Sequence, residues 1–168
     1  MMRRSIVTLE NWAVRLEGAI LFVTLFSLIV LLVLQVLFRF VLQAPLAFTE
    51  EAGRVFFAWL VFVGAARALY VSQHFMVDIL YNHVPATLQR IFGYVSDAAS
   101  LGLAVIFAYA GFRMIGHGGQ ILPVLGVPAW VQNLALPVGM SLLAFHALCF
   151  ILRREHVGDG AKHDFEEE

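Results

Sequence analysis

The segment from residue 48 to residue 74 decides the fold, and it reads FTEEAGRVFFAWLVFVGAARALYVSQH. Its stretch 52–72 is long enough to cross a bilayer as a helix, which requires roughly 20 apolar residues. Yet Glu50, Glu51 and Arg54 cluster at its start, and Arg67 lies in its second half. Because a cation inside a membrane helix costs about 2.5–3.5 kcal/mol, Arg67 should face protein, water or lipid headgroups rather than lipid tails. The sequence therefore predicts a membrane helix that packs against a neighbour.

The composition of the whole chain agrees with a membrane protein. Apolar residues make up 61% of the 168 residues and charged residues 14%, whereas a soluble domain is about 45–50% apolar and about 25% charged. The net charge of −1 argues against a nucleic-acid partner, and the single cysteine excludes CxxC metal or redox sites. No catalytic Ser/His/Asp triad, catalytic pair of acids or HExxH metalloprotease motif is visible, so we predict neither an enzyme nor a cofactor.

We predict an all-α integral membrane protein with four transmembrane helices, at about residues 18–38, 52–72, 91–115 and 129–152. The first span is bounded by Glu17 and Arg39, and residues 17–153 form one domain. An even number of spans places both termini on one side of the membrane. That side carries more basic residues, which the positive-inside rule assigns to the cytoplasm. The basic residues near the termini are Arg3, Arg4, Arg15, Arg153, Arg154 and Lys162.

The two ends of the chain are expected to differ from the spans. In residues 1–16 the apolar side chains share one helical face, which is typical of an amphipathic helix on the cytoplasmic leaflet. A cytoplasmic extension of the first spanning helix explains the same pattern, and both interpretations stay open. Residues 154–168 are polar, and we predict a disordered cytoplasmic tail.

The charged start of the second span has two interpretations. Glu50 and Arg54 are four residues apart and Glu51 and Arg54 three apart, so both pairs can meet on a helix surface. Glutamates in a first turn also favour the positive end of the helix, which makes a simple cap at headgroup level possible. The alternative is an external polar patch that docks a partner.

Several residues of the spans are candidates for contacts with other molecules. Arg67 and His74 lie seven residues apart and share a helical face; Arg67 either snorkels to phosphates or pairs with a partner subunit, directly or through a lipid headgroup. Ser96 and Ser100 allow close helix packing in the third span. Pro137 is expected to kink the fourth span unless neighbouring groups satisfy the freed carbonyl.

Two histidines suggest a different function. His74 and His146 lie on different helices toward the cytoplasmic side, so together they could ligate a b-type haem. The alternative function is therefore a haem-binding membrane anchor subunit of a respiratory oxidoreductase.

Part of the chain resembles a known family. Thr49-Glu50-Glu51 followed by Arg54, Trp59, Gly64-Ala65, Arg67 and His74 resembles the small membrane subunit of tripartite ATP-independent periplasmic (TRAP) transporters, the DctQ-like family. The stretch 125–130 leading to 136–139 is similar to the final hairpin of that family. The resemblance covers roughly residues 10–153.

The resemblance implies a complex in the bacterial inner membrane. A periplasmic substrate-binding protein would deliver an organic acid, such as a dicarboxylate or sialic acid, to a large elevator-type permease subunit driven by a sodium gradient. The small subunit would be a scaffold that binds no substrate. It implies that Glu50, Glu51 and Arg54 lie near the docking surface of the binding protein. It further implies contacts with the large subunit or with phospholipids at Trp59, Gly64, Arg67, His74, Ser96, Ser100 and Pro137.

Overall fold

The computed structural model describes residues 2–44, 46–81, 86–115 and 119–163. Within them the chain forms helices α1 (Met2–Phe40), α2 (Phe48–Tyr81), α3 (Ala86–Ile115), α4 (Trp130–Asn133) and α5 (Ala135–His163). Four stretches of these helices are long and apolar enough to cross a membrane: Leu9–Phe40, Phe48–Val71, Gly93–Ile115 and Trp130–Leu152. This confirms the prediction of an all-helical chain with four spanning helices.

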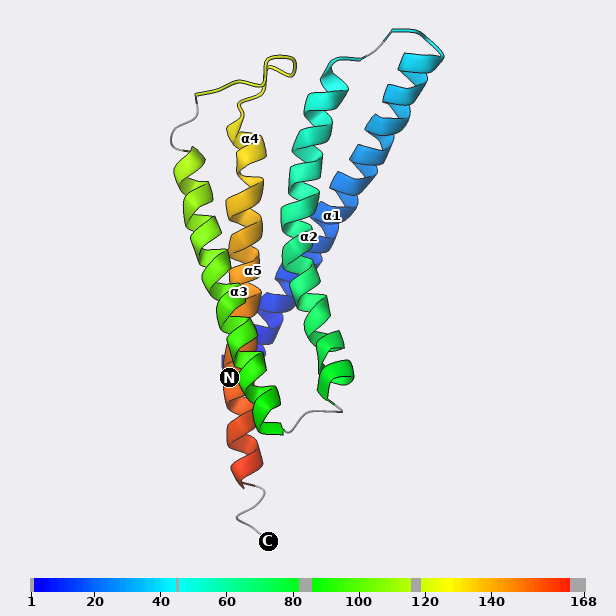
Figure 1. Cartoon of the computed structure of the whole chain (residues 1–168). Helices are drawn as coiled ribbons and strands as arrows, with labels where there is room; N and C mark the ends of the chain where they lie inside the picture. The colour runs from blue at the N-terminus through cyan, green and yellow to red at the C-terminus, as the bar shows by residue number, and fades with distance from the viewer. Residues whose placement is uncertain (1, 45, 82–85, 116–118, 164–168) are drawn as a thin grey trace.

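Helix α1 is longer than the predicted first span. It runs over 39 residues from Met2 to Phe40, which at 1.5 Å per residue is about 58 Å. The hydrocarbon core of a bilayer is only about 30 Å thick, so such a helix must tilt or extend beyond it. Residues 2–16 thus continue the first span as the same helix, and α1 leans across the other helices (Figure 1).

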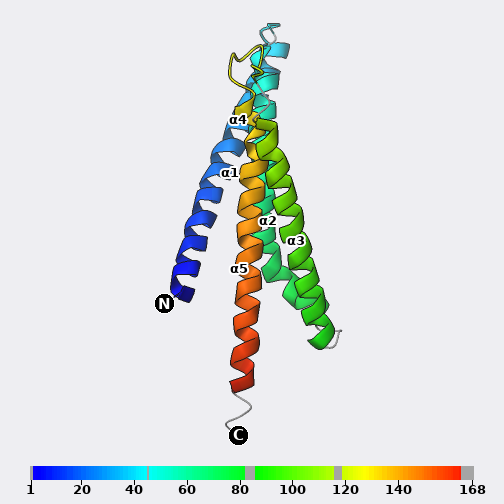
Figure 2. The same ribbon diagram turned by 90° about the vertical axis from the view of Figure 1, so that its left-hand side faces the viewer.

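The four long helices form a twisted layer. Helices α2 and α5 pack together in its middle, α1 packs on α2, and α3 packs on α5. The chain termini lie at one end, here called the termini end, and the loop after α1 and the connection before α4 lie at the other, the hairpin end (Figure 1). Helix α1 lies apart from α3 at the hairpin end in Figure 1 and at the termini end in Figure 2, so α1 crosses the other helices at an angle.

Two close approaches hold the layer together. A Cβ atom on Gly139 of α5 would lie 2.6 Å from the carbonyl group of Phe62, so glycine lets α2 and α5 touch there. A Cβ atom on Gly111 of α3 would lie 2.8 Å from the Cδ atom of Pro137. Such small-residue contacts are the usual packing device between helices in lipid. Pro137 is therefore buried between α3 and α5 of the same chain.

The position of Pro137 also explains the end of α4. Proline has no N–H, but the N–H groups in the first turn of a helix have no intrahelical acceptor. Pro137 is the third residue of α5, so it interrupts no bond of that helix. Pro137 has no N–H for the carbonyl of Asn133, the last residue of α4. Leu134, between α4 and α5, nevertheless keeps right-handed helical backbone angles (φ −62°, ψ −25°), and its carbonyl oxygen accepts the N–H of Val138 at 3.1 Å.

The outer helices expose broad apolar surfaces. In the most apolar 18 residues of α1 only 6% of the residues are buried. In the most apolar 18 residues of Trp130–Leu152 the buried share is 39%. The exposed apolar side chains of α1 include Phe22, Phe26, Ile29, Val33, Val36 and Phe40, and those of α3 include Val95, Leu103, Ile106, Phe107 and Phe112. Surfaces of this extent face lipid or another protein.

Candidate functional site

Two polar contact regions lie at opposite ends of the layer. The first, here called the hairpin clasp, joins α2 to the connection between α3 and α4. The Oε2 atom of Glu51 accepts hydrogen bonds from the backbone N–H groups of Val124 at 3.0 Å and Leu125 at 2.9 Å. The indole N–H of Trp59 donates to the carbonyl oxygen of Val131 at 3.1 Å. The clasp therefore joins α2 to residues that lie more than seventy positions later in the sequence.

The segment held by the clasp is a small β-hairpin. Ile121 and Pro128 form an antiparallel bridge, and the N–H of Leu122 donates to the carbonyl of Val127 at 2.9 Å. The turn closes at Gly126, whose φ of 66° lies in the left-handed region that glycine adopts without strain. The turn amides at residues 124 and 125 are thereby directed at Glu51, so the carboxylate closes a preformed turn.

The clasp separates the three charged residues at the start of α2. Glu51 is only 5% exposed and is directed at the hairpin, whereas Glu50 and Arg54 are exposed. Arg54 donates from Nε to the backbone carbonyl of Glu50 at 3.4 Å. Of the three residues predicted at a docking surface, Glu50 and Arg54 are thus accessible, and Glu51 shapes the loop beside them.

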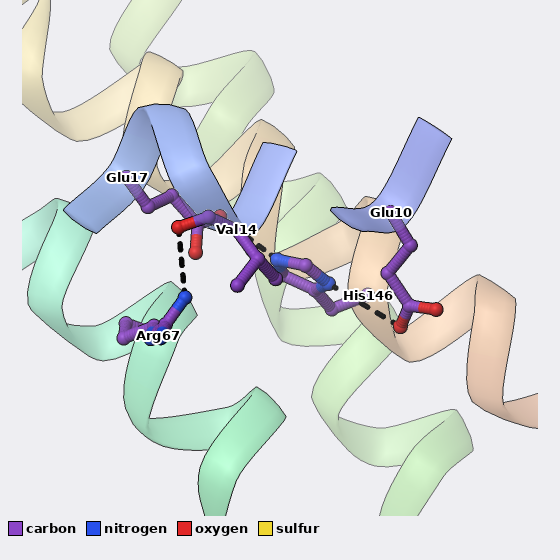
Figure 3. Close-up of polar contacts among 5 residues, drawn as sticks. All are labelled: Glu10, Val14, Glu17, Arg67 and His146. Atoms are coloured by element: carbon purple, nitrogen blue, oxygen red, sulfur yellow. Dashed lines mark hydrogen bonds and ion pairs between the residues drawn. The ribbon is translucent and has the colours of Figure 1, made fainter. Parts of the chain in front are cut away.

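The second region, here called the termini-end cluster, consists of Glu10, Glu17, Arg67 and His146 (Figure 3). The Nε2 atom of His146 lies 2.8 Å from Oε1 of Glu17, and its Nδ1 atom lies 3.8 Å from Oε1 of Glu10. Both carboxylates and the imidazole are at most 1% exposed. Three helices meet here, because α1 supplies the carboxylates, α2 the arginine and α5 the histidine.

The regular geometry of α1 explains how two carboxylates reach one ring. Glu10 and Glu17 are seven residues apart, close to two turns at 3.6 residues per turn, so they share a helical face. The ring of His146 lies between them and packs against the ring of Tyr70 at 5.3 Å and that of Phe145 at 5.7 Å between centroids. The aromatic rings cover the imidazole, and the imidazole and both carboxylates are excluded from bulk water, whereas Arg67 is half-buried.

Arg67 has an acceptor inside its own chain. Its Nη1 atom donates to the carbonyl oxygen of Val14 at 2.8 Å, and its guanidinium carbon lies 5.7 Å from the centre of the Tyr70 ring. Val14 lies on α1 between the two glutamates in the sequence, and Arg67 lies on the Glu17 side of the His146 ring, with Glu10 on the other side (Figure 3). The sequence suggests two partners for Arg67: lipid phosphates, or a partner subunit reached directly or through a lipid headgroup. The structure adds a third, the backbone of α1.

The other predicted contact residues have varied environments. Gly64 faces Leu21 of α1, and a Cβ atom added at Gly64 would lie 3.7 Å from the Leu21 side chain. Ser96 is exposed and Ser100 half-buried on α3. His74 lies in α2, and its side chain is outside the described residues. Trp59 and Pro137 contact other helices of the same chain, as given above.

The sequence did not single out the two glutamates of the cluster. Glu10 lies in the predicted amphipathic segment 1–16 and Glu17 at the predicted boundary of the first span, yet both are buried. The available signal was their seven-residue spacing on a helix that is otherwise apolar on that side. Their partner His146 is 129 residues from Glu17, a pairing that no local pattern indicates.

The haem alternative is not supported. The ring nitrogens of His146 face the two carboxylates of α1 instead of an open position for iron. Among the described residues, no three His, Cys, Asp or Glu side chains are arranged to hold a metal ion. The cluster is an arrangement of charges that links helices.

Comparison with known sequences assigns the chain to a class and then to a family. Its spans make it a multi-pass membrane protein. Residues 28–156 match the sequence model of the tripartite ATP-independent periplasmic transporters, DctQ component. The match covers most of the chain, which therefore belongs to the DctQ family of TRAP small permease subunits and is a protein of the inner membrane.

Individual relatives agree with this assignment. The C4-dicarboxylate TRAP transporter small permease protein DctQ of Pseudomonas aeruginosa is 28% identical over 71% of this chain, which spans 61% of that protein. A relative from Haemophilus influenzae, a TRAP small permease by its name, is 34% identical over 85% of this chain and 82% of the relative. The isethionate TRAP transporter permease protein DctMQ of Oleidesulfovibrio alaskensis is 26% identical over 79% of this chain and 22% of its own length.

Proposed function

We propose that the chain is the scaffold subunit of a sodium-driven TRAP transporter for an organic acid, such as a dicarboxylate or sialic acid, and binds no substrate itself. The observation that carries this proposal is the contrast between its inside and its outside. Its buried carboxylates are engaged in contacts within the chain, while α1 and α3 present broad apolar faces outward. A thin layer with such faces suits a subunit that enlarges the fixed frame of a larger permease.

The partner that covers one of these faces is a large permease subunit of the DctM type. Supporting this, the DctMQ permease protein of Oleidesulfovibrio alaskensis contains a region similar to this chain that makes up 22% of its length. In that protein the region is covalently joined to the rest of a permease. The remaining apolar surface would contact phospholipids, with Ser96 and Ser100 on α3 and Arg67 near the termini end as further contact points.

The orientation that we propose places both termini in the cytoplasm, as the positive-inside rule favours. The hairpin end then faces the periplasm, and the exposed Glu50 and Arg54 form part of the surface on which the periplasmic binding protein docks. Glu51 serves this surface indirectly, because it holds the hairpin beside it.

Reconstitution in proteoliposomes tests the scaffold function. We expect no uptake of the organic acid by this chain alone. Uptake should appear when the chain is combined with the large permease and the binding protein, and it should require an inward sodium gradient. Sodium-dependent uptake by this chain alone would contradict the proposal, and so would full uptake by the large permease and binding protein without it.

The docking surface is tested by charge reversal in the same assay. Replacing Glu50 by Lys together with Arg54 by Glu should raise severalfold the binding-protein concentration needed for half-maximal uptake, while the complex still assembles. A conservative control, Glu50→Asp with Arg54→Lys, should change it far less. An unchanged concentration dependence in the reversed variant would place docking elsewhere.

A further inference from the structure

The imidazole of His146 is directed at two carboxylates of one helix. Its Nε2 atom lies at hydrogen-bond distance from Glu17, at 2.8 Å, and its Nδ1 atom is 3.8 Å from Glu10 (Figure 3). Both glutamates and the histidine are almost completely buried. Because the ring is shielded from bulk water, its contacts with the two carboxylates determine how many protons it carries.

The geometry fits a ring with two protons better than a ring with one. A neutral imidazole donates from one nitrogen and carries a lone pair on the other, whereas an ionised carboxylate only accepts. With Glu17 ionised, the short contact places a proton on Nε2, which donates to the carboxylate. In a neutral ring the lone pair of Nδ1 would then face Glu10, and among the described residues Nδ1 has no hydrogen-bond partner. A second proton turns this repulsion into an ion-pair attraction, which acts at 3.8 Å.

The charges of the cluster lead to the same conclusion. Two carboxylates buried together are costly unless positive charges compensate them. Arg67 supplies one such charge, bound to the Val14 carbonyl between the glutamates. An imidazolium at His146 adds a positive charge between the two carboxylates. Among the described side chains, the other titratable groups close to the ring are Tyr70 of α2 and Cys149 one turn along α5, which are uncharged in their protonated forms.

We infer that His146 is a proton-binding site: its imidazolium, held between Glu10 and Glu17, fastens the termini-end half of α1 to α5. Helix α1 packs mainly on α2 and makes far fewer contacts with α5, so this charge is the principal polar link between α1 and α5 among the described residues. Loss of the second ring proton releases α1 from α5 at the termini end. This inference does not depend on the proposed transport role.

The first test reads the proton directly. The full chain, labelled with ¹⁵N-histidine and placed in lipid nanodiscs, is measured by NMR at about pH 6 to about pH 9, across the range where histidine titrates. The His146 signals among the six histidines are assigned by their loss in the variant His146→Gln. We expect two protonated ring nitrogens for His146 at the lower pH. One protonated and one unprotonated nitrogen there would overturn the proposal.

The second test reads the position of α1. Spin labels are attached at Trp12→Cys on α1 and Val95→Cys on α3 in a Cys149→Ala background, since both positions are exposed and these helices diverge at the termini end (Figure 2). Glutamine at position 146 keeps an N–H donor for Glu17 but carries no charge. His146→Gln should broaden the label-to-label distance distribution and shift it to longer distances, whereas Glu50→Gln at the hairpin end should leave it unchanged. An unaltered distribution in His146→Gln would overturn the fastening role.

Discussion

The hairpin clasp and the termini-end cluster both bury a glutamate, but they satisfy it in different ways. Glu51 accepts two backbone N–H groups on one oxygen, and those donors are neutral and held in place by a turn. Glu17 accepts from a ring nitrogen of His146, and its Oε2 atom has no hydrogen-bond partner among the described residues. A carboxylate that uses backbone donors fixes a loop, whereas one that uses a titratable side chain links helices through charge.

The difference has consequences for the two ends of the molecule. At the hairpin end the clasp gives a fixed surface beside the exposed Glu50 and Arg54, and this surface depends on hydrogen bonds rather than on a charge balance. At the termini end the cluster determines where α1 lies relative to α5 and hence how its apolar face is presented. Matched substitutions at the two ends should therefore change the free energy of unfolding by different amounts.

The largest effect is expected for Glu17→Leu. It removes the carboxylate at hydrogen-bond distance from the buried His146, and breaking a buried ion pair costs about 3–5 kcal/mol. The free energy of unfolding, measured by denaturant titration in mixed micelles, should fall by about that amount. The control Glu50→Leu, on an exposed side chain, should change it by about 0.5 kcal/mol or less. Equal losses in the two variants would remove the distinction between buried and exposed carboxylates.

The junction of α2 and α5, which connects the two ends, should be the next most sensitive point. Gly139→Ala places a methyl group 2.6 Å from the backbone of Phe62, and such overpacking costs about 1–3 kcal/mol. Gly102→Ala is the matched control, because a Cβ atom there meets nothing within 4 Å. Alanine is favoured over glycine inside a helix by about 0.5–1 kcal/mol, so this control should be stabilised. The same sign for both variants in the unfolding assay would contradict the close approach.

Glutamine substitutions sharpen the comparison of the two carboxylates. Glu51→Gln retains a carbonyl oxygen for the amides of the hairpin, so the cost should stay near the net value of one hydrogen bond, about 0.5–1.5 kcal/mol. Glu17→Gln retains an acceptor for His146 but removes the charge opposite an imidazolium, and it should destabilise the chain more than Glu51→Gln does. Unfolding titrations of both variants at one pH provide the measurement, and the reverse order would argue against a charged ring at position 146.

The smallest effect is expected for Trp59→Phe. This variant keeps an aromatic ring but loses the donor to the Val131 carbonyl, which should lower the free energy of unfolding by about 0.5–1.5 kcal/mol. Faster proteolytic cleavage within residues 119–129 should accompany it, because the hairpin then depends on Glu51 alone. Trp12→Phe, on an exposed side chain of α1, serves as the control and should leave the cleavage rate unchanged.

The number and approximate position of the membrane helices follow from the sequence alone, because a long apolar run is a local property of the chain. The acidic pair, Arg54 and Trp59 of the second segment also indicated the family before any coordinates. The burial of Glu51 could not be read there, because its partners are amides more than seventy residues away.

Which polar residues meet depends on how the helices pack in three dimensions. The sequence places Glu17 at the boundary of a span and Pro137 at a kink in the fourth span, and in the structure both side chains are buried against other helices of the same chain. His146 was weighed as a haem ligand, and its ring is held by α1 instead. The physical reason is that apolar patterns specify which segments enter a membrane, whereas the pairing of buried charges depends on how those segments cross.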